Sequence, residues 1–168
     1  VLDEEIDITE DKARDIEVTK GEVEFRHVYF KYKKEAPEYV LSDINLHIRP
    51  GETVGIVGQT GSAKTTLVQL IPRLYDITSG ELLIDGRPVE EYPLKNLRDA
   101  VAVVLQKNTL FSGTLRENLL WGDSSASREE IEEACRTAGA DEFIGRLEQG
   151  YDTEMGQGGV NVSGGQKQ

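Results

Sequence analysis

The stretch GQTGSAKTT, residues 58–66, decides the fold because it nearly matches the pattern of a phosphate-binding loop. That pattern is G-x-x-x-x-G-K-[ST], and Gly58, Lys64 and Thr65 fit it. Ala63 stands where the pattern has its second glycine. A phosphate loop needs a strand that aims the backbone, a loop whose N–H groups converge, and a helix whose N-terminus faces the anion. The sequence predicts these three parts, in order, from GIVG, QTGS and KTTLVQLI.

Ala63 affects such a loop through its geometry. If the position needs a positive φ, alanine costs about 1–2 kcal/mol. A methyl pushed into a tight site costs roughly 1–3 kcal/mol more. If φ is helical and the methyl points away, the loss is small, and the sequence leaves both cases open. We expect weaker ATP binding with the shape of the loop kept, and a gain of at least about tenfold on Ala63→Gly. The alternative is a glycine-rich turn with an exposed lysine.

Strand patterns surround the loop. Residues 21–32 read as a bent strand or a hairpin, and apolar residues alternate from Ile44 to Ile48. Residues 52–58 and 100–106 are predicted to be buried strands. Residues 79–89 combine a short strand with a tight Asp-Gly turn.

Helical patterns follow the loop and fill the later part of the chain. Residues 63–76 are expected to be helical, with a kink or an early end near Pro72, and a short helix is expected over 93–100. The periodicity is helical over 114–122 and 125–150, where Ser127 is a predicted N-cap. The expected class is α/β: a P-loop NTPase-like core with an antiparallel β subdomain and a helical subdomain, incomplete at the C-terminus.

Composition narrows the function classes. The chain has 168 residues and a formal net charge of −12, which argues against a nucleic-acid binder. No stretch approaches the run of about 20 apolar residues that crosses a bilayer, and nothing at the N-terminus resembles a signal peptide. The lone Cys135 forms no internal disulfide, which fits a reducing compartment. Residues 1–20 are acidic and read as a linker or extended arm, with a solvated tail as the equal alternative.

Further motifs carry a resemblance to a known family. VSGGQ, Val162–Gln166, with the glycine loop resembles the ATP-binding cassette family, whose signature is LSGGQ. Residues 103–122 resemble its glutamine loop, with Gln106 at the key place, and LFSGTLRENL resembles the exporter subgroup. Tyr32 matches the family's adenine-stacking aromatic residue. TEMGQGG, residues 153–159, resembles the exporter stretch that touches the transmembrane partner. The resemblance runs from Gly21 to Gln168.

The resemblance implies ATP and Mg²⁺ as cofactors. Lys64 and Gln106 are the implied catalytic residues, and Thr65 and Gln106 the implied metal ligands. Ser163, Gly164 and Gly165 would close over the γ-phosphate held by a second chain, although Ser163 also reads as an ordinary N-cap. The implied nucleotide-binding residues are Tyr32, Gly58, Thr60, Gly61, Ser62, Ala63, Lys64, Thr65, Thr66, Ser163, Gly164, Gly165 and Gln166.

The implied partners are a second nucleotide-binding domain, as a homo- or heterodimer, and the transmembrane domain of an exporter, with no nucleic acid. The expected place is the cytoplasmic face of a membrane. Residues 1–20 would be the arm and 21–168 the N-terminal portion of the domain, with its core over about 21–106 and its helical subdomain over about 107–168.

The family's Asp-Glu strand and switch histidine are expected after the signature, and the 168 residues do not contain them. We therefore expect this chain alone not to turn over ATP. His27 and His47 are expected on the surface or on strand faces, and Asp85 is rejected as the magnesium-organising acid. Cys135 and Trp121 are expected to pack, with a partner-facing surface as the alternative for Trp121.

The leading function is the ATP-driven motor of an exporter. The alternative is a cassette or fragment that only binds nucleotide, impaired by Ala63 and by the missing motifs. A soluble relative that acts on DNA ends is disfavoured by the exporter-like segment and by the acidic balance.

Overall fold

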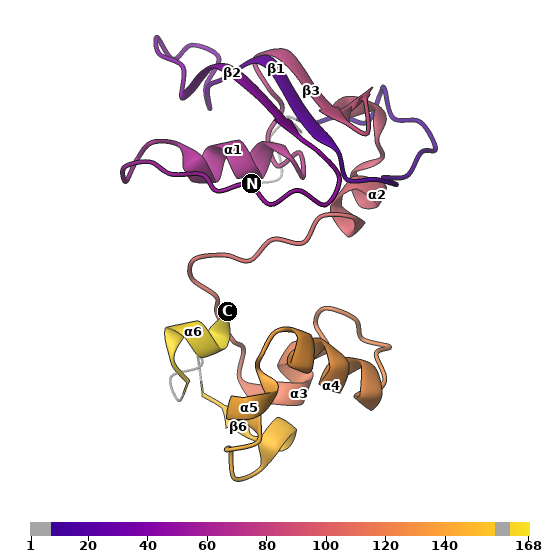
Figure 1. Cartoon of the computed structure of the whole chain (residues 1–168), viewed down its shortest axis with the longest axis vertical. Helices are drawn as coiled ribbons and strands as arrows, with labels where there is room; N and C mark the ends of the chain where they lie inside the picture. Colours follow the sequence, from indigo (N-terminus) through magenta and orange to yellow (C-terminus); the bar gives the residue numbers. More distant parts are fainter. Residues whose placement is uncertain (1–7, 157–161) are drawn as a thin grey trace, which may run out of the picture. The chain divides into compact units, whose positions relative to one another are not determined.

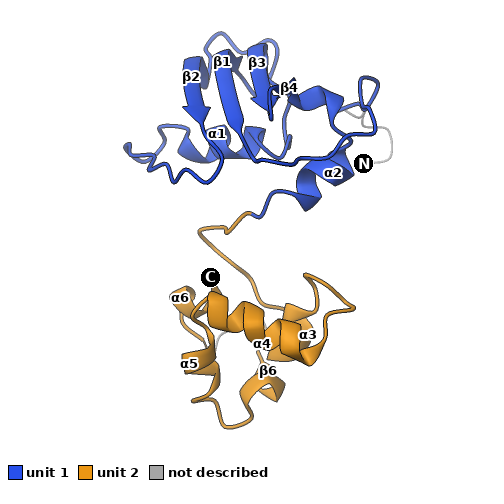
Figure 2. Ribbon diagram, turned by 45° about the vertical axis from the view of Figure 1, so that its right-hand side comes forward, with its two compact units in different colours: residues 1–102 blue, residues 103–168 orange. Residues whose placement is uncertain are grey.

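The computed structural model describes residues 8–156 and 162–168. The chain divides into two compact units, residues 1–102 (unit 1) and 103–168 (unit 2), coloured separately in Figure 2. Within the described residues, no helix has both the length and the apolar character needed to cross a membrane.

Unit 1 is built on an antiparallel sheet in the order β2-β1-β3-β4. Phe25 of β1 pairs with Leu46 of β2 on one side and Leu82 of β3 on the other. The pairing shifts register after Phe25, where His27 has a φ of 47°. Residues 21–32 therefore contribute one bent strand and no hairpin. The strands are β1 (Val23–Phe30), β2 (Leu41–Ile48), β3 (Ser79–Ile84) and β4 (Arg87–Pro88).

Helices cover one face of this sheet, and α1 lies across it in both ribbon views (Figures 1 and 2). The helix from the glycine loop ends at Leu70, before Pro72, so of the two predicted alternatives the early end is observed. The alternating strand residues and the inner faces of the helices form one core, which includes Phe25, Leu70 and Leu97. The helices of unit 1 are α1 (Lys64–Leu70), the 3₁₀ turn η1 (Val89–Glu91) and α2 (Leu94–Asp99).

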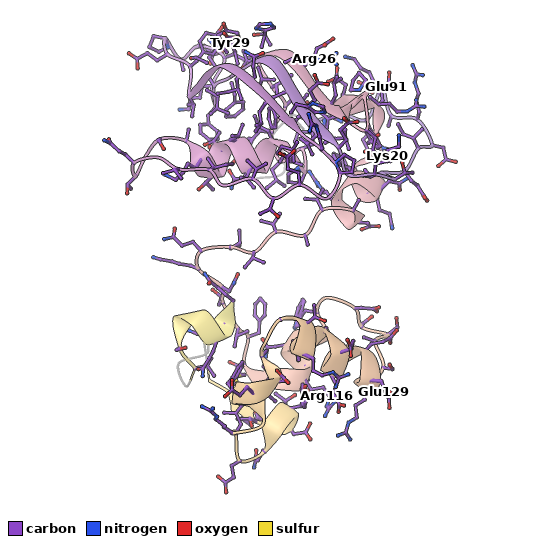
Figure 3. The ribbon with its side chains drawn as sticks, in the orientation of Figure 1. Lys20, Arg26, Tyr29, Glu91, Arg116 and Glu129 are labelled. Atoms are coloured by element: carbon purple, nitrogen blue, oxygen red, sulfur yellow. The ribbon has the colours of Figure 1, made fainter. Side chains whose placement is uncertain are left out.

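Residues 8–20 pack along unit 1. The backbone N–H of Arg14 donates to the carbonyl of Glu91 at 2.8 Å. The carboxylate of Asp85, in the β3–β4 turn, accepts from the backbone N–H groups of Thr19 and Lys20 at 2.7 and 2.9 Å. Lys20 and Glu91 are labelled in Figure 3. Over these residues the extended arm is the better reading, because a solvated tail makes no such contacts.

Two predicted strands are not observed. Residues 52–58 and 100–106 contain no strand, and none of the described strands pairs with them. Their side chains are accordingly open to solvent, with Val57 98% exposed and Val104 72% exposed. A strand is defined by its ladder partners, and apolar patterning cannot supply a partner.

Unit 2 is mainly helical, with β5 and β6 paired antiparallel. Its core is a small cluster of Leu115, Ile131, Cys135, Ile144 and Met155. Its elements are β5 (Gly113–Thr114), α3 (Leu115–Leu119), α4 (Arg128–Thr137), α5 (Asp141–Ile144), η2 (Gly150–Asp152), β6 (Glu154–Met155) and α6 (Gly164–Lys167).

Local capping explains where the helices of unit 2 begin. Ser127 caps α4 as predicted, with its hydroxyl accepting from the N–H of Glu130, whose carboxylate accepts from the N–H of Ser127. Burial of Cys135 is also as predicted. Trp121 is 74% exposed, so the expectation that it packs in the core is wrong. It follows α3 and stacks on Phe111, which is itself exposed.

Candidate functional site

The glycine loop closes around the ammonium group of Lys64. This group donates to the carbonyls of Gly58 and Gln59, each at 2.7 Å, and lies 3.3 Å from the hydroxyl of Ser62. The N–H of Ser62 donates to the carbonyl of Gln59 at 3.2 Å and tightens the turn. One positive charge is thus held by the loop's own oxygens, and Gly58–Lys64 forms one unit as the motif predicts.

Gly58 packs closely against the Ser62 side chain inside the loop. A Cβ at this position would lie 2.6 Å from the Ser62 hydroxyl, closer than side-chain atoms approach one another. Gly61 has a φ of 85°, in the left-handed region that glycine adopts readily. The two glycines therefore serve different needs: one leaves space and the other allows the turn.

The start of α1 fits an anion. Ala63 is its N-cap and offers no side-chain hydrogen bond, so no capping side chain occupies the first N–H groups of the helix. Thr65 is exposed beside Lys64, whereas Thr66 is buried. One cation, an exposed hydroxyl and an uncapped helix start are the donor set that a nucleotide phosphate requires.

The backbone of Ala63 shows whether its φ is positive or helical, which the sequence left open. Its φ of 59° and ψ of 20° are left-handed, so the backbone strain of a non-glycine residue is present. The residue is partly buried and packs against the core cluster of unit 1. This packing favours the case in which the methyl points away from the phosphate site over the case in which it is pushed into a tight site.

Tyr32 joins the loop through a hydrogen bond. Its hydroxyl lies 2.8 Å from the hydroxyl of Thr66, in the first turn of α1. Its side chain is 52% exposed, so much of the ring surface is available. The structure thus brings together Tyr32 and the loop residues that the sequence predicted, with Thr60 exposed at the outer turn.

The remaining predicted residues belong to unit 2. Ser163 caps α6 with its hydroxyl accepting from the N–H of Gln166, so its capping role is confirmed. Gly164 and Gly165 are exposed in the first turn. Gln106 is exposed, and its carbonyl accepts from the Gln168 side chain at 3.3 Å. Of TEMGQGG, residues 157–159 lie outside the described residues.

Over residues 8–156 and 162–168, no three His, Cys, Asp or Glu side chains gather to hold an ion. Thr65 and Gln106, the two metal ligands expected from the resemblance, belong to different units. Each is exposed and carries a side-chain oxygen that could bind Mg²⁺.

The residues set aside from the sequence occupy the sheet and its turns. His27 and His47 lie on β1 and β2, where they pair with Asp43 at 2.7 Å and Glu22 at 2.6 Å. Asp85 lies in the β3–β4 turn, as expected for a peripheral hairpin.

Sequence reasoning missed Tyr75. Its ring lies 5.1 Å from that of Tyr32, measured between centroids. The only signal was an aromatic residue shortly after the loop helix, in PRLYD, and no periodicity connects it to Tyr32.

The chain is similar in sequence and in structure to ABC transporters. A family model described as ABC transporter matches residues 41–168. Multidrug export ATP-binding/permease proteins of Staphylococcus aureus strains COL and bovine RF122 are each 48% identical over 170 residues. A solved bacterial Atm1-family ABC exporter with ATP bound has a TM-score of 0.89 at 35% identity over 99% of the chain. The chain spans 29% of the length of each of these proteins.

Proposed function

Because the chain belongs to the ABC transporter family, we propose that it is the ATP-binding motor domain of an exporter. In this proposal ATP binding closes two such domains, hydrolysis reopens them, and the change drives transport at the cytoplasmic face of a membrane. The observation that carries the proposal is the loop at Gly58–Thr66, with its lysine charge and uncapped helix start, bonded to an exposed tyrosine.

Each residue has a role that follows from its chemistry. Lys64 donates to two loop carbonyls and would exchange them for the β- and γ-phosphate oxygens of ATP. Tyr32 offers an aromatic face to adenine, worth roughly 1–3 kcal/mol of stacking. Thr65 and Gln106 would hold Mg²⁺, which bridges phosphate oxygens and neutralises their charge. Ser163, Gly164 and Gly165 would contact the γ-phosphate bound by a second domain.

The test is an ATP titration of the intact protein with two lysine variants. Lys64→Ala should weaken ATP binding by about tenfold to hundredfold, because charge-assisted hydrogen bonds to phosphate are lost. Lys95→Ala removes the same charge from an exposed ion pair on α2 and should leave the affinity unchanged. Equal effects of both variants would reject the loop as the nucleotide site.

A second titration separates the base from the phosphates. Tyr32→Ala should weaken ATP by roughly tenfold or more and leave inorganic triphosphate unaffected. If both ligands weaken equally, Tyr32 has no stacking role.

The transmembrane partner is proposed to contact the surface formed by Phe111 and Trp121. Their rings stack at 5.0 Å and both are exposed, in the segment that follows Gln106. The side chain of Asn118 holds this segment, accepting from the N–H of Phe111 at 2.7 Å and donating to its carbonyl at 2.9 Å. Asn118 is thus a poor site for a crosslinking cysteine.

Ser124 is a better site, because it borders the open pocket beside Trp121. A cysteine at Ser124 should crosslink to a transmembrane subunit in an ATP-dependent manner. The native Cys135 is buried, which limits background reaction. A crosslink yield that ignores ATP would contradict the coupling.

A cassette that only binds nucleotide is the second candidate. The positive φ of Ala63 motivates it, since backbone strain of a non-glycine residue is present within the phosphate loop. Phosphate release measured beside the ATP titration distinguishes the two functions. Turnover that Lys64→Ala abolishes would support the motor, and saturable binding without turnover would support the alternative.

A further inference from the structure

We propose that Tyr75 and Thr66 are positioning residues that hold the ring of Tyr32 ready for a purine base. Neither acts on the reacting phosphates in this role; both act through Tyr32. The inference rests on the proposed ATP-binding function and adds to it the means by which base recognition is ordered.

The first part of the argument is the cluster of three rings. Tyr32 lies 4.9 Å from Phe30 and 5.1 Å from Tyr75 between ring centroids, at interplanar angles of 82° and 84°. Phe30 and Tyr75 are 5.7 Å apart, so each ring contacts the other two. Edge-to-face pairs at such distances are the favoured arrangement of aromatic side chains. Phe30 is buried at the end of β1 and anchors the cluster in the core.

The second part is the hydroxyl contact at the other end of the ring. The Tyr32 hydroxyl lies 2.8 Å from that of Thr66, which is only 6% exposed. Tyr32 follows β1 and lies outside it, so the sheet does not fix its side chain. A ring edge and a hydroxyl together restrict both of its side-chain torsions. A base that stacks on a ring already ordered loses less conformational entropy than one that must order it.

The third part is the support behind Tyr75. Arg73, at the turn after α1, has a φ of 50° and is 4% exposed. Its guanidinium donates to the carboxylate of Asp76 at 2.5 Å and to the carbonyl of Thr9 at 3.0 Å. Arg98 donates to the Arg73 carbonyl at 3.0 Å. This buried turn fixes the backbone that presents Tyr75, whose own ring stays 40% exposed.

The test measures binding of ATP and of inorganic triphosphate to the intact protein by titration calorimetry. Tyr75→Leu should weaken ATP binding about two- to tenfold and leave triphosphate binding unchanged. Tyr75→Phe keeps the ring and should restore the wild-type ratio of the two affinities. Tyr39→Leu is the matched control, because it removes an exposed tyrosine of unit 1 that pairs with Tyr29 outside the cluster.

A double-mutant cycle tests the hydroxyl contact. Tyr32→Phe and Thr66→Val should each weaken ATP about two- to tenfold, and the double variant should be no weaker than either one. Thr66→Ser should retain wild-type binding. If Thr66→Val weakens triphosphate as much as ATP while Tyr32→Phe changes nothing, the threonine serves a phosphate and the proposal is wrong.

The outcomes also distinguish the positioning role of Tyr75 and Thr66 from the stacking role of Tyr32 on which it rests. Loss of ATP affinity in Tyr32→Ala, with wild-type binding in both Tyr75→Leu and Tyr32→Phe, would overturn only the positioning role. Wild-type ATP binding in Tyr32→Ala would overturn the stacking function itself.

Discussion

Helices begin differently in the two units. In unit 2, α3, α4 and α6 each start with a capping box, in which Thr114, Ser127 and Ser163 exchange hydrogen bonds with the residue three positions on. In unit 1, α1 and α2 start at Ala63 and Pro93 without a side-chain cap from the N-cap residue.

The difference lies in which groups accept hydrogen bonds from the first backbone N–H groups of each helix. The N–H of Leu94 in α2 donates to the carboxylate of Glu10 at 2.6 Å, a group far away in the sequence. The start of α1 has no such cap and remains open to an anion. Three helix starts of unit 2 are capped locally, with α5 at Ala140 the exception, whereas α2 of unit 1 depends on a distant group and α1, in our proposal, on a ligand. Substitutions that remove distant contacts should therefore disturb unit 1 most.

Gly80→Ala should destabilise unit 1 and leave unit 2 unaffected, and its loss of unfolding free energy should be the largest of these variants. A Cβ there would lie 2.2 Å from the His27 carbonyl, at a φ of 93°. We expect a loss of about 4 kcal/mol or more, the sum of overpacking and backbone strain. Gly86→Ala has a φ of 75° but no atom within 4 Å, so it should cost only about 1–2 kcal/mol. Hydrogen exchange should show β1 and β3 open while α4 stays protected; equal loss from both variants would contradict this.

Asp85→Asn should loosen the arm and change the acid sensitivity of unit 1. Burial raises the pKa of Asp85, but hydrogen bonds from Lys20, Thr19 and Glu22 outweigh it and hold the pKa below its usual value. A carboxyl pKa lowered by folding gives stability that is present above the unfolded pKa of about 3.9 and lost as pH falls through the lower folded value. We expect Asp85→Asn to reduce the free energy of unfolding by about 1–3 kcal/mol at pH 7.

Urea denaturation from pH 7 to pH 3 measures this effect. The Asp85→Asn variant should lose less stability on acidification than the parent. Asp99→Asn removes the same charge from an exposed pair with Lys95 and should change little. An unchanged acid slope in Asp85→Asn would mean that the arm contacts do not stabilise the unit.

Ala63→Gly tests the uncapped start of α1. The left-handed backbone is strained in the folded loop, and the methyl packs on the core, so relief should appear in stability first. We expect a gain of about 1 kcal/mol in unfolding free energy and a change in ATP affinity below about tenfold, smaller than the sequence alone predicted.

Thermal unfolding and ATP titration of Ala63→Gly test this together. Ala100→Gly, at a right-handed position after α2, should be neutral or destabilising. A tenfold gain in affinity without a gain in stability would mean that the methyl obstructs the phosphates after all.

Ser127→Ala should have the smallest effect and be confined to unit 2. Loss of the cap on α4 costs about 1 kcal/mol, whereas Ser127→Asn keeps an acceptor and should cost little. Amide exchange in α4 is the readout. A larger increase of amide exchange in β1 than in α4 would contradict the expectation that the loss of this cap affects unit 2 only.

Local signals explain what the sequence could predict. The turn around Lys64 with its following helix, the cap at Ser127 and the alternation from Ile44 to Ile48 depend on neighbours within a few residues, and the structure shows each of them. The strand predicted before the loop, at 55–58, is not observed. The α/β class follows from the same signals. The other candidate site residues, such as Tyr32 and Gln106, are inferred from the family resemblance and not from local pattern.

Non-local contacts explain what it could not predict. The approach of Tyr75 to Tyr32 depends on the turn at Arg73, and the packing of residues 8–20 depends on Asp85. The direction of the Ala63 methyl depends on a core assembled from several elements. Apolar runs at 52–58 and 100–106 predicted strands, but pairing requires a second segment that local pattern does not identify.

Those two runs also lead to an expectation for the protein in concentrated solution. Residues 53–58 and 101–106 are uncharged, rich in valine and free of proline, and their backbones lie outside the described ladders. Exposed segments of this composition are templates for intermolecular β-pairing and aggregation. The net charge of −12 opposes such association by mutual repulsion, and added salt screens that repulsion. Solubility should therefore fall as ionic strength rises, and a single lysine in place of Val57 or Val104 should restore it.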